Sequence, residues 1–211
     1  MVYRVADIIS DVKTALDENV SSVALTGIGD SDQLSLDAII ASKVVEAVER
    51  VHLEAPAYLL ENGHNFGDAV YWGEMESGWV LLPDDFMRLV VFEMDDWERA
   101  VYSAISVDDP DYGKQRSRIK GIRGTSQKPV CVLAMRPEGR VLEFYSCKSE
   151  AAQVSRGVYI PYPSIDEAGG VDISERCYKA VVYTVAWLTL ITCGEAEKAS
   201  VLSEMAKTYL Q

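Results

Sequence analysis

Paired carboxylates are the residues of this chain best suited by type to acid–base chemistry or metal binding. They occur as Asp84-Asp85, Asp95-Asp96 and Asp108-Asp109. Catalysis by two carboxylates requires side chains that converge on one cleft with pKa values pushed apart. Neighbouring side chains in strands and turns point in different directions, and aspartate is common in solvated turns. We therefore expect these pairs to form turns and not a catalytic or metal site.

A second candidate for chemistry is Gly29-Asp30-Ser31, which resembles the opening of the GDS-type esterase motif with a serine nucleophile. That chemistry needs a histidine base near the C-terminus, and the only histidines here are His52 and His64. The segment also lies between two predicted helices and does not follow a strand. We expect it to cap a helix, through Asp30, Ser31 or Asp32.

Cysteine spacing gives no metal site either. No two of the cysteines form a CxxC pair, and two histidines cannot complete a zinc ligand set by spacing. The four are Cys131, Cys147, Cys177 and Cys193. We predict no catalytic residue, no cofactor and no metal ion, and we expect the protein not to be an enzyme.

Charge is concentrated in one basic segment of an acidic chain. The formal net charge of the 211 residues is −13, yet residues 114–128 hold six basic and no acidic side chains. A protein with this balance is not a general nucleic-acid binder, because neutralising phosphates requires excess Lys and Arg over a surface. We predict that this basic loop contacts an acidic neighbouring subunit or the DNA backbone through Lys114, Arg116, Arg118, Lys120, Arg123 and Lys128. The alternative is a flexible, solvated loop without a partner.

The apolar periodicity predicts helices at both ends of the chain and strands in the middle. Helical spacing covers residues 3–17, 33–53, 172–193 and 195–210. Period-2 patterns predict strands at 69–72, 79–82, 87–93, 98–105, 130–135, 141–146 and 154–160. The predicted fold class is α+β, with a helical bundle from residues 1–66 and 171–211 and an inserted β-rich, barrel- or sandwich-like lobe at residues 67–170. The longest apolar run, residues 180–193, is too short to span a bilayer, so we expect a soluble protein without membrane contact.

Three stretches carry a resemblance to a known family: LPDDFMRLVVFEMDDWERAV, DDPDYGKQ and RGTSQKPV. They are similar to the central region of head-to-tail adaptor (connector) proteins of tailed bacteriophages, of the tail tubular protein A type of short-tailed phages. The closing segment from Gly194 to Leu210 also resembles the family's last helix. The chain departs after Cys147, where Lys148-Ser149-Glu150 stands in place of a proline-rich turn.

The resemblance implies a structural virion protein at the portal–tail junction, made in the host cytoplasm. It implies a ring of twelve identical copies that joins the portal protein to tail or nozzle proteins. Double-stranded DNA would pass through the ring during ejection without sequence-specific binding. Family members commonly use C-terminal segments to grip the portal, and we assign portal docking here to Leu202, Met205, Tyr209 and Leu210. A hydrolase using the carboxylate-rich loops and a bacterial binding module are the alternatives.

Overall fold

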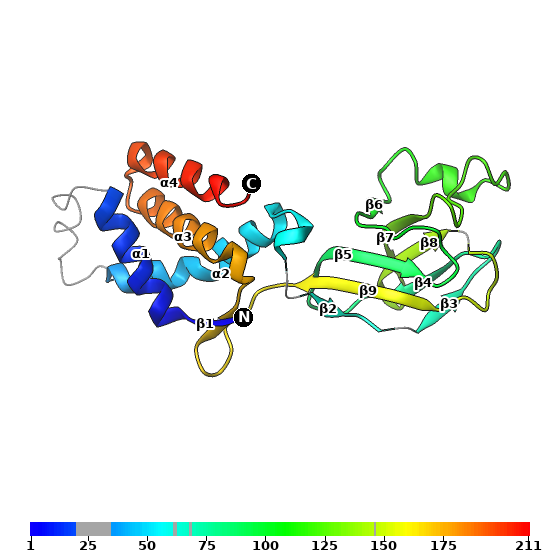
Figure 1. The fold of residues 1–211 in the computed structure, drawn as a ribbon, viewed down its shortest axis with the longest axis horizontal. Helices are drawn as coiled ribbons and strands as arrows, with labels where there is room; N and C mark the ends of the chain where they lie inside the picture. The colour runs from blue at the N-terminus through cyan, green and yellow to red at the C-terminus, as the bar shows by residue number, and fades with distance from the viewer. Residues whose placement is uncertain (20–34, 61–62, 68, 146) are drawn as a thin grey trace. The chain divides into compact units, whose positions relative to one another are not determined.

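A computed structural model of the chain describes residues 1–19, 35–60, 63–67, 69–145 and 147–211. The chain divides into two compact units (Figure 1). The terminal unit combines Met1–Asn62 with Tyr162–Gln211, and the central unit is Gly63–Pro161. The boundaries predicted from the sequence lie at residues 66/67 and 170/171.

The predicted fold class, a helical bundle with one inserted β-rich lobe, is wrong. The described residues form a mixed α+β protein with four α-helices and ten strands in three sheets. Strands occur in the terminal unit as well, where β1 (Val2–Arg4) pairs antiparallel with β10 (Gly170–Asp172). A strand of three residues is too short to show a period-2 pattern, and this is why the sequence did not predict the pair.

The helices of the terminal unit pack around α3, which contacts the other three (Figure 1). Their bounds are α1 Val5–Asn19, α2 Leu36–Glu54, α3 Tyr178–Thr192 and α4 Ala196–Thr208, with short 3-10 turns η1 Ala57–Leu59 and η3 Glu175–Cys177. Helix α3 is apolar over most of its surface, so it can be buried on several sides at once. Gly194, at φ 83°, follows α3 and lets the chain turn into α4.

Helix α2 begins at a serine cap. The Ser35 hydroxyl accepts a hydrogen bond from the backbone N–H of Ala38 at 3.2 Å. This satisfies one of the donors that every helix N-terminus leaves without an intrahelical partner. The caps predicted at Asp30, Ser31 and Asp32 lie outside the described residues, as does the whole Gly29-Asp30-Ser31 motif.

The central unit consists of two sheets that share one core. The first has the order β2-β9-β5, and the second has the order β3-β4-β8-β7-β6. The strands are β2 His64–Asn65, β3 Val70–Trp72, β4 Gly78–Leu81, β5 Phe86–Met94, β6 Ile105–Ser106, β7 Val130–Arg136, β8 Gly139–Tyr145 and β9 Val154–Pro161. Phe92 of β5 and Phe144 of β8 are both fully buried, and their ring centroids are 5.8 Å apart. This aromatic contact joins the inner faces of the two sheets.

One local prediction about the central unit is also wrong. The strand predicted at residues 98–105 does not form: residues 98–104 make one isolated bridge, Val101 with Phe92, and the two-residue strand β6 begins at Ile105. The basic loop begins with a 3-10 turn, η2 (Gly113–Arg116), and further turns and bends follow up to residue 123. Strands β7 and β8 form an antiparallel hairpin in which Arg136 pairs with Gly139. Within the described ranges, no helix has the length and apolarity needed to cross a membrane.

Candidate functional site

The paired carboxylates form turns, as the sequence predicts. The carboxylate of Asp85 accepts a hydrogen bond from the Tyr159 hydroxyl at 2.8 Å, and that of Asp95 accepts one from the backbone N–H of Gln153 at 3.0 Å. Asp109 similarly accepts from the backbone N–H of Asp111 at 2.8 Å. In the part of the chain that the structure describes, no three His, Cys, Asp or Glu side chains are placed to hold a metal ion.

The two histidines occupy very different surroundings. His64 is exposed on β2. His52 is 5 % exposed at the end of α2, where its Nε2 accepts the backbone N–H of Ser174 at 3.5 Å. Burial lowers the pKa of His52 to about 4, against the opposing influence of the Asp172 carboxylate. The side chain is therefore neutral at physiological pH and belongs to the packing of the terminal unit.

A buried glutamine closes the basic loop on itself. Gln115 is 3 % exposed; its Oε1 accepts the backbone N–H of Gly124 at 2.7 Å, and its Nε2 donates to the carbonyl of Asp111 at 3.0 Å. A Cβ at Gly124 would lie 3.1 Å from the Tyr145 carbonyl and 3.1 Å from the Val130 nitrogen. The loop thus closes tightly against the first residues of β7.

The six basic residues predicted as contacts divide into two groups. Arg123 is buried, with its guanidinium 3.5 Å from the Glu76 carboxylate, so it stabilises its own unit instead of facing a partner. The other five are exposed: Lys114, Arg116, Arg118, Lys120 and Lys128.

The exposed cations also differ in the partners they have within the chain. Lys114 pairs with Asp111 at 2.5 Å, and the Arg116 guanidinium lies 5.4 Å from the ring centroid of Tyr112. Among the described residues, Arg118 and Lys120 have no ion pair.

Two aliphatic side chains stand among these cations. Ile119 is 63 % exposed and Ile122 is 49 % exposed. A loop that is fixed at its base and exposes both cations and aliphatic groups has the composition of a contact surface, because burial of the aliphatic groups supplies affinity and the charges supply specificity.

The four residues assigned to portal docking do not share one surface. Leu202 is fully buried in the core of the terminal unit and is unable to reach a partner. Met205 lines an open groove of about 630 Å³ along α4, together with Trp187 and Val201. Leu210 lines a second hollow of about 270 Å³ on the terminal unit. Tyr209 faces a third pocket, on the α1 side of α3.

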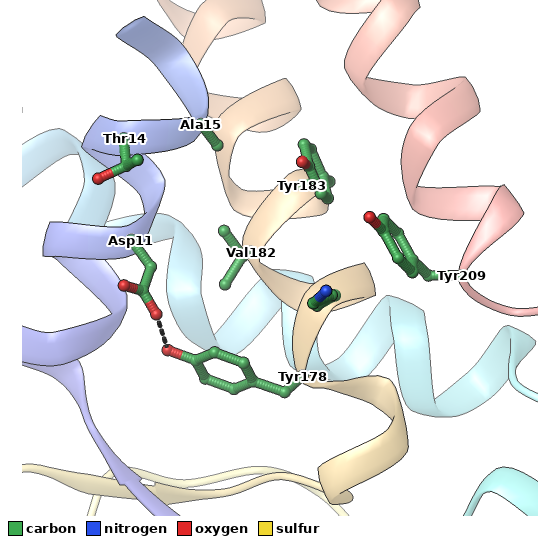
Figure 2. Close-up of a pocket in the computed structure, with 8 residues that line it drawn as sticks. Asp11, Thr14, Ala15, Tyr178, Val182, Tyr183 and Tyr209 are labelled. Carbon is green, nitrogen blue, oxygen red and sulfur yellow. Dashed lines mark hydrogen bonds between the residues drawn. The ribbon is translucent and has the colours of Figure 1, made fainter. Parts of the chain in front are cut away.

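That third pocket, which we call the tyrosine pocket, lies between α1, α3 and the end of α4 and has a volume of about 240 Å³ (Figure 2). Tyr183 and Tyr209 stack on each other with ring centroids 5.5 Å apart. On the opposite side, the Tyr178 hydroxyl donates to the Asp11 carboxylate at 2.6 Å (Figure 2). Burial, and then this hydrogen bond to Asp11, raise the pKa of Tyr178. The remaining lining residues are Thr14, Ala15, Lys179 and Val182.

Sequence reasoning missed both Gln115 and the tyrosine pocket. A glutamine within a run of exposed basic residues gives no pattern that distinguishes it from its neighbours. For the pocket a signal was available: Tyr178, Val182 and Tyr183 recur at helical spacing on α3. Two polar-tipped aromatic residues on one side of a buried helix indicate a place where that helix reaches the surface.

No protein-family model matches the chain, and a search of curated proteins gives no match.

Proposed function

We propose that this protein is a structural adaptor of a phage virion, which assembles into a ring of identical copies between the portal and the tail. The observation that carries the proposal is the anchored basic loop, which exposes five of its six cations on a chain that is otherwise strongly acidic. The terminal unit has 18 acidic and 8 basic side chains, a formal charge of −10. The central unit, which bears the loop, has a formal charge of only −3.

This asymmetry favours a head-to-tail contact between copies. The cations of one loop attract the acidic terminal unit of the next copy, and the two exposed isoleucines add apolar area to the contact. A contact between two different surfaces of identical copies is heterologous, and it closes into a ring when the rotation between copies permits. The family resemblance sets the expected number at twelve copies.

The acidic balance of the chain also suits the passage of DNA through such a ring. Most of the surface would repel the phosphate backbone, so double-stranded DNA would pass without stable binding. The portal and the tail or nozzle proteins are the proposed neighbours, at the portal–tail junction of the virion. For the portal contact we retain Met205, with the groove along α4 that it shares with Trp187 and Val201, and the chain end at Tyr209 and Leu210. Leu202 is removed from this set because it is buried.

Charge reversal in the loop tests the proposal. Changing Arg116, Arg118 and Lys120 together to Glu should abolish self-assembly and leave the fold intact, because exposed charges contribute little to stability. The matched control reverses three exposed cations elsewhere in the central unit, Arg99→Glu, Lys148→Glu and Arg156→Glu, and so changes the net charge equally.

Sedimentation velocity measures assembly of both triple variants, and thermal unfolding measures the fold. The proposal predicts assembly of the control at low salt and a monomeric loop variant with an unchanged unfolding transition. Equal loss of assembly in the two variants would mean that overall charge, and not the loop, controls association. Normal assembly of the loop variant would contradict the proposed contact.

A further inference from the structure

The tyrosine pocket has the chemistry of a site for a guanidinium group. Three tyrosine rings line it, and the faces of aromatic rings attract cations through their quadrupole. The Asp11 carboxylate stands at the same pocket, where it accepts a hydrogen bond from the Tyr178 hydroxyl. A planar cation that stacks on a ring and donates to a carboxylate can use both features, and arginine is the side chain with that combination.

A cation already occupies part of this environment. The Lys179 ammonium lies 5.5 Å from the ring centroid of Tyr209 and is itself a lining residue. Two further exposed carboxylates act on the tyrosines of this region without lining the pocket: Asp7 acts electrostatically on Tyr178, and Glu175 acts on Tyr3, whose ring stacks on Tyr178 at 4.2 Å. With Asp11, these give three carboxylates against one lysine. The neighbourhood therefore favours one further cation.

We infer that the tyrosine pocket receives Arg118 from the basic loop of a neighbouring copy. This inference rests on the proposed ring, since it names the surface on which the loop docks. Arg118 is exposed and has no ion pair among the described residues, so its transfer to the pocket breaks no salt bridge. The pocket, at about 240 Å³, suits one long side chain and not a helix.

The same chain shows that its tyrosines and arginines make such contacts. Arg116 lies 5.4 Å from the centroid of the Tyr112 ring within the loop itself. In the docked state Arg118 would replace Lys179 at Tyr209 and approach Asp11, while the exposed Ile119 would cover the apolar floor made by Ala15 and Val182. Lys179 is exposed and so can turn outward into solvent.

Changes at Asp11 and Lys179 should shift association in opposite directions, which a purely structural role of the two residues would not predict. Asp11→Asn retains an oxygen acceptor for the Tyr178 hydroxyl but removes the charge, and it should weaken association of the full chain about 3- to 10-fold. Lys179→Ala removes the competing cation and should strengthen association about 2- to 5-fold. The matched controls are Glu197→Gln and Lys207→Ala, which make the same charge changes at exposed positions of α4 outside the pocket.

The association constant of each variant is measured by sedimentation velocity over a concentration series at low salt, where charge contacts are least screened. The reciprocal pair Asp11→Arg with Arg118→Asp in one chain should recover association that either change alone abolishes. Two results would overturn the pocket as the docking site without contradicting the ring: control variants that change the association constant as much as the pocket variants do, or a reciprocal pair that stays dissociated. A wild-type chain that stays monomeric throughout would overturn both the ring and the pocket.

Discussion

His52 should make the terminal unit unstable in mild acid. The side chain is 5 % exposed, and burial lowers its pKa from 6.5 to about 4. In the unfolded chain the imidazole takes up a proton below about pH 6.5, whereas in the folded chain it stays neutral until about pH 4. The stability that depends on neutral His52 is therefore complete above pH 6.5 and is lost as the pH falls toward 4.

The expected magnitude follows from these two pKa values. Between pH 7.5 and pH 4.5, the difference in proton binding between the unfolded and folded chains lowers the free energy of unfolding by about 2.5 kcal/mol. Carboxylates that titrate over the same range add their own contribution, so the wild-type value alone does not isolate the histidine. The variant His52→Gln supplies an amide oxygen that can accept the Ser174 N–H, and it has no charge at either pH.

Urea unfolding followed by circular dichroism measures the free energy of unfolding of both chains at pH 7.5 and pH 4.5. We expect the loss between the two pH values to be about 2.5 kcal/mol smaller in His52→Gln than in the wild type. The control is His64→Gln, because His64 is exposed and is the only other histidine. Equal pH dependence in His52→Gln and the wild type would refute the argument that burial keeps this imidazole neutral.

Three further predictions concern the surfaces assigned above. Gln115→Ala should leave the Gly124 N–H without its acceptor and destabilise the closed loop by about 1–3 kcal/mol. Amide hydrogen exchange should become faster at Gly124 and change little in β7 and β8. Unchanged protection of Gly124 would contradict the anchoring role. Arg123→Glu should lower the free energy of unfolding by about 3 kcal/mol or more, because it places a second carboxylate in a buried site beside Glu76. Arg118→Glu, at an exposed position, should change it little. Equal stability of the two variants in urea unfolding would show that the two arginines have equivalent surroundings. Met205→Glu should weaken binding to portal particles in a pull-down assay while the chain still self-assembles, and undiminished portal binding would place the portal contact elsewhere.

The sequence predicted the long elements well because their patterns are strong. The helical spacing of α1, α2, α3 and α4 and the alternation in β5, β7, β8 and β9 all correspond to elements of the structure. The fold class failed on short elements: β1, β10 and β6 each have three residues or fewer, and such strands are selected by their partners and not by their own sequence. The strand predicted at residues 98–105 is absent for a different reason. Val101 belongs to the core, but a loop and not a strand carries it there.

The candidate site was predictable only in part, since residue type fixes what a side chain can do and tertiary contacts fix whether it is exposed. Charge counting found the basic loop, but it did not separate buried Arg123 from exposed Arg118. Helical periodicity found the apolar positions of α4, but it did not place Leu202 in the core and Tyr209 at a pocket. The tyrosine pocket depends on side chains from α1, α3 and the chain end, which no local pattern connects.

The central claim is that copies of this chain assemble head to tail into a ring on the portal. Electron cryomicroscopy of the full chain mixed with purified portal particles tests it most directly. The account predicts a closed ring of identical copies on the portal, with the basic loop of each copy against the terminal unit of the next and Arg118 beside Asp11. Single copies scattered on the portal, a ring in which residues 114–128 face solvent, or no binding at all would contradict it.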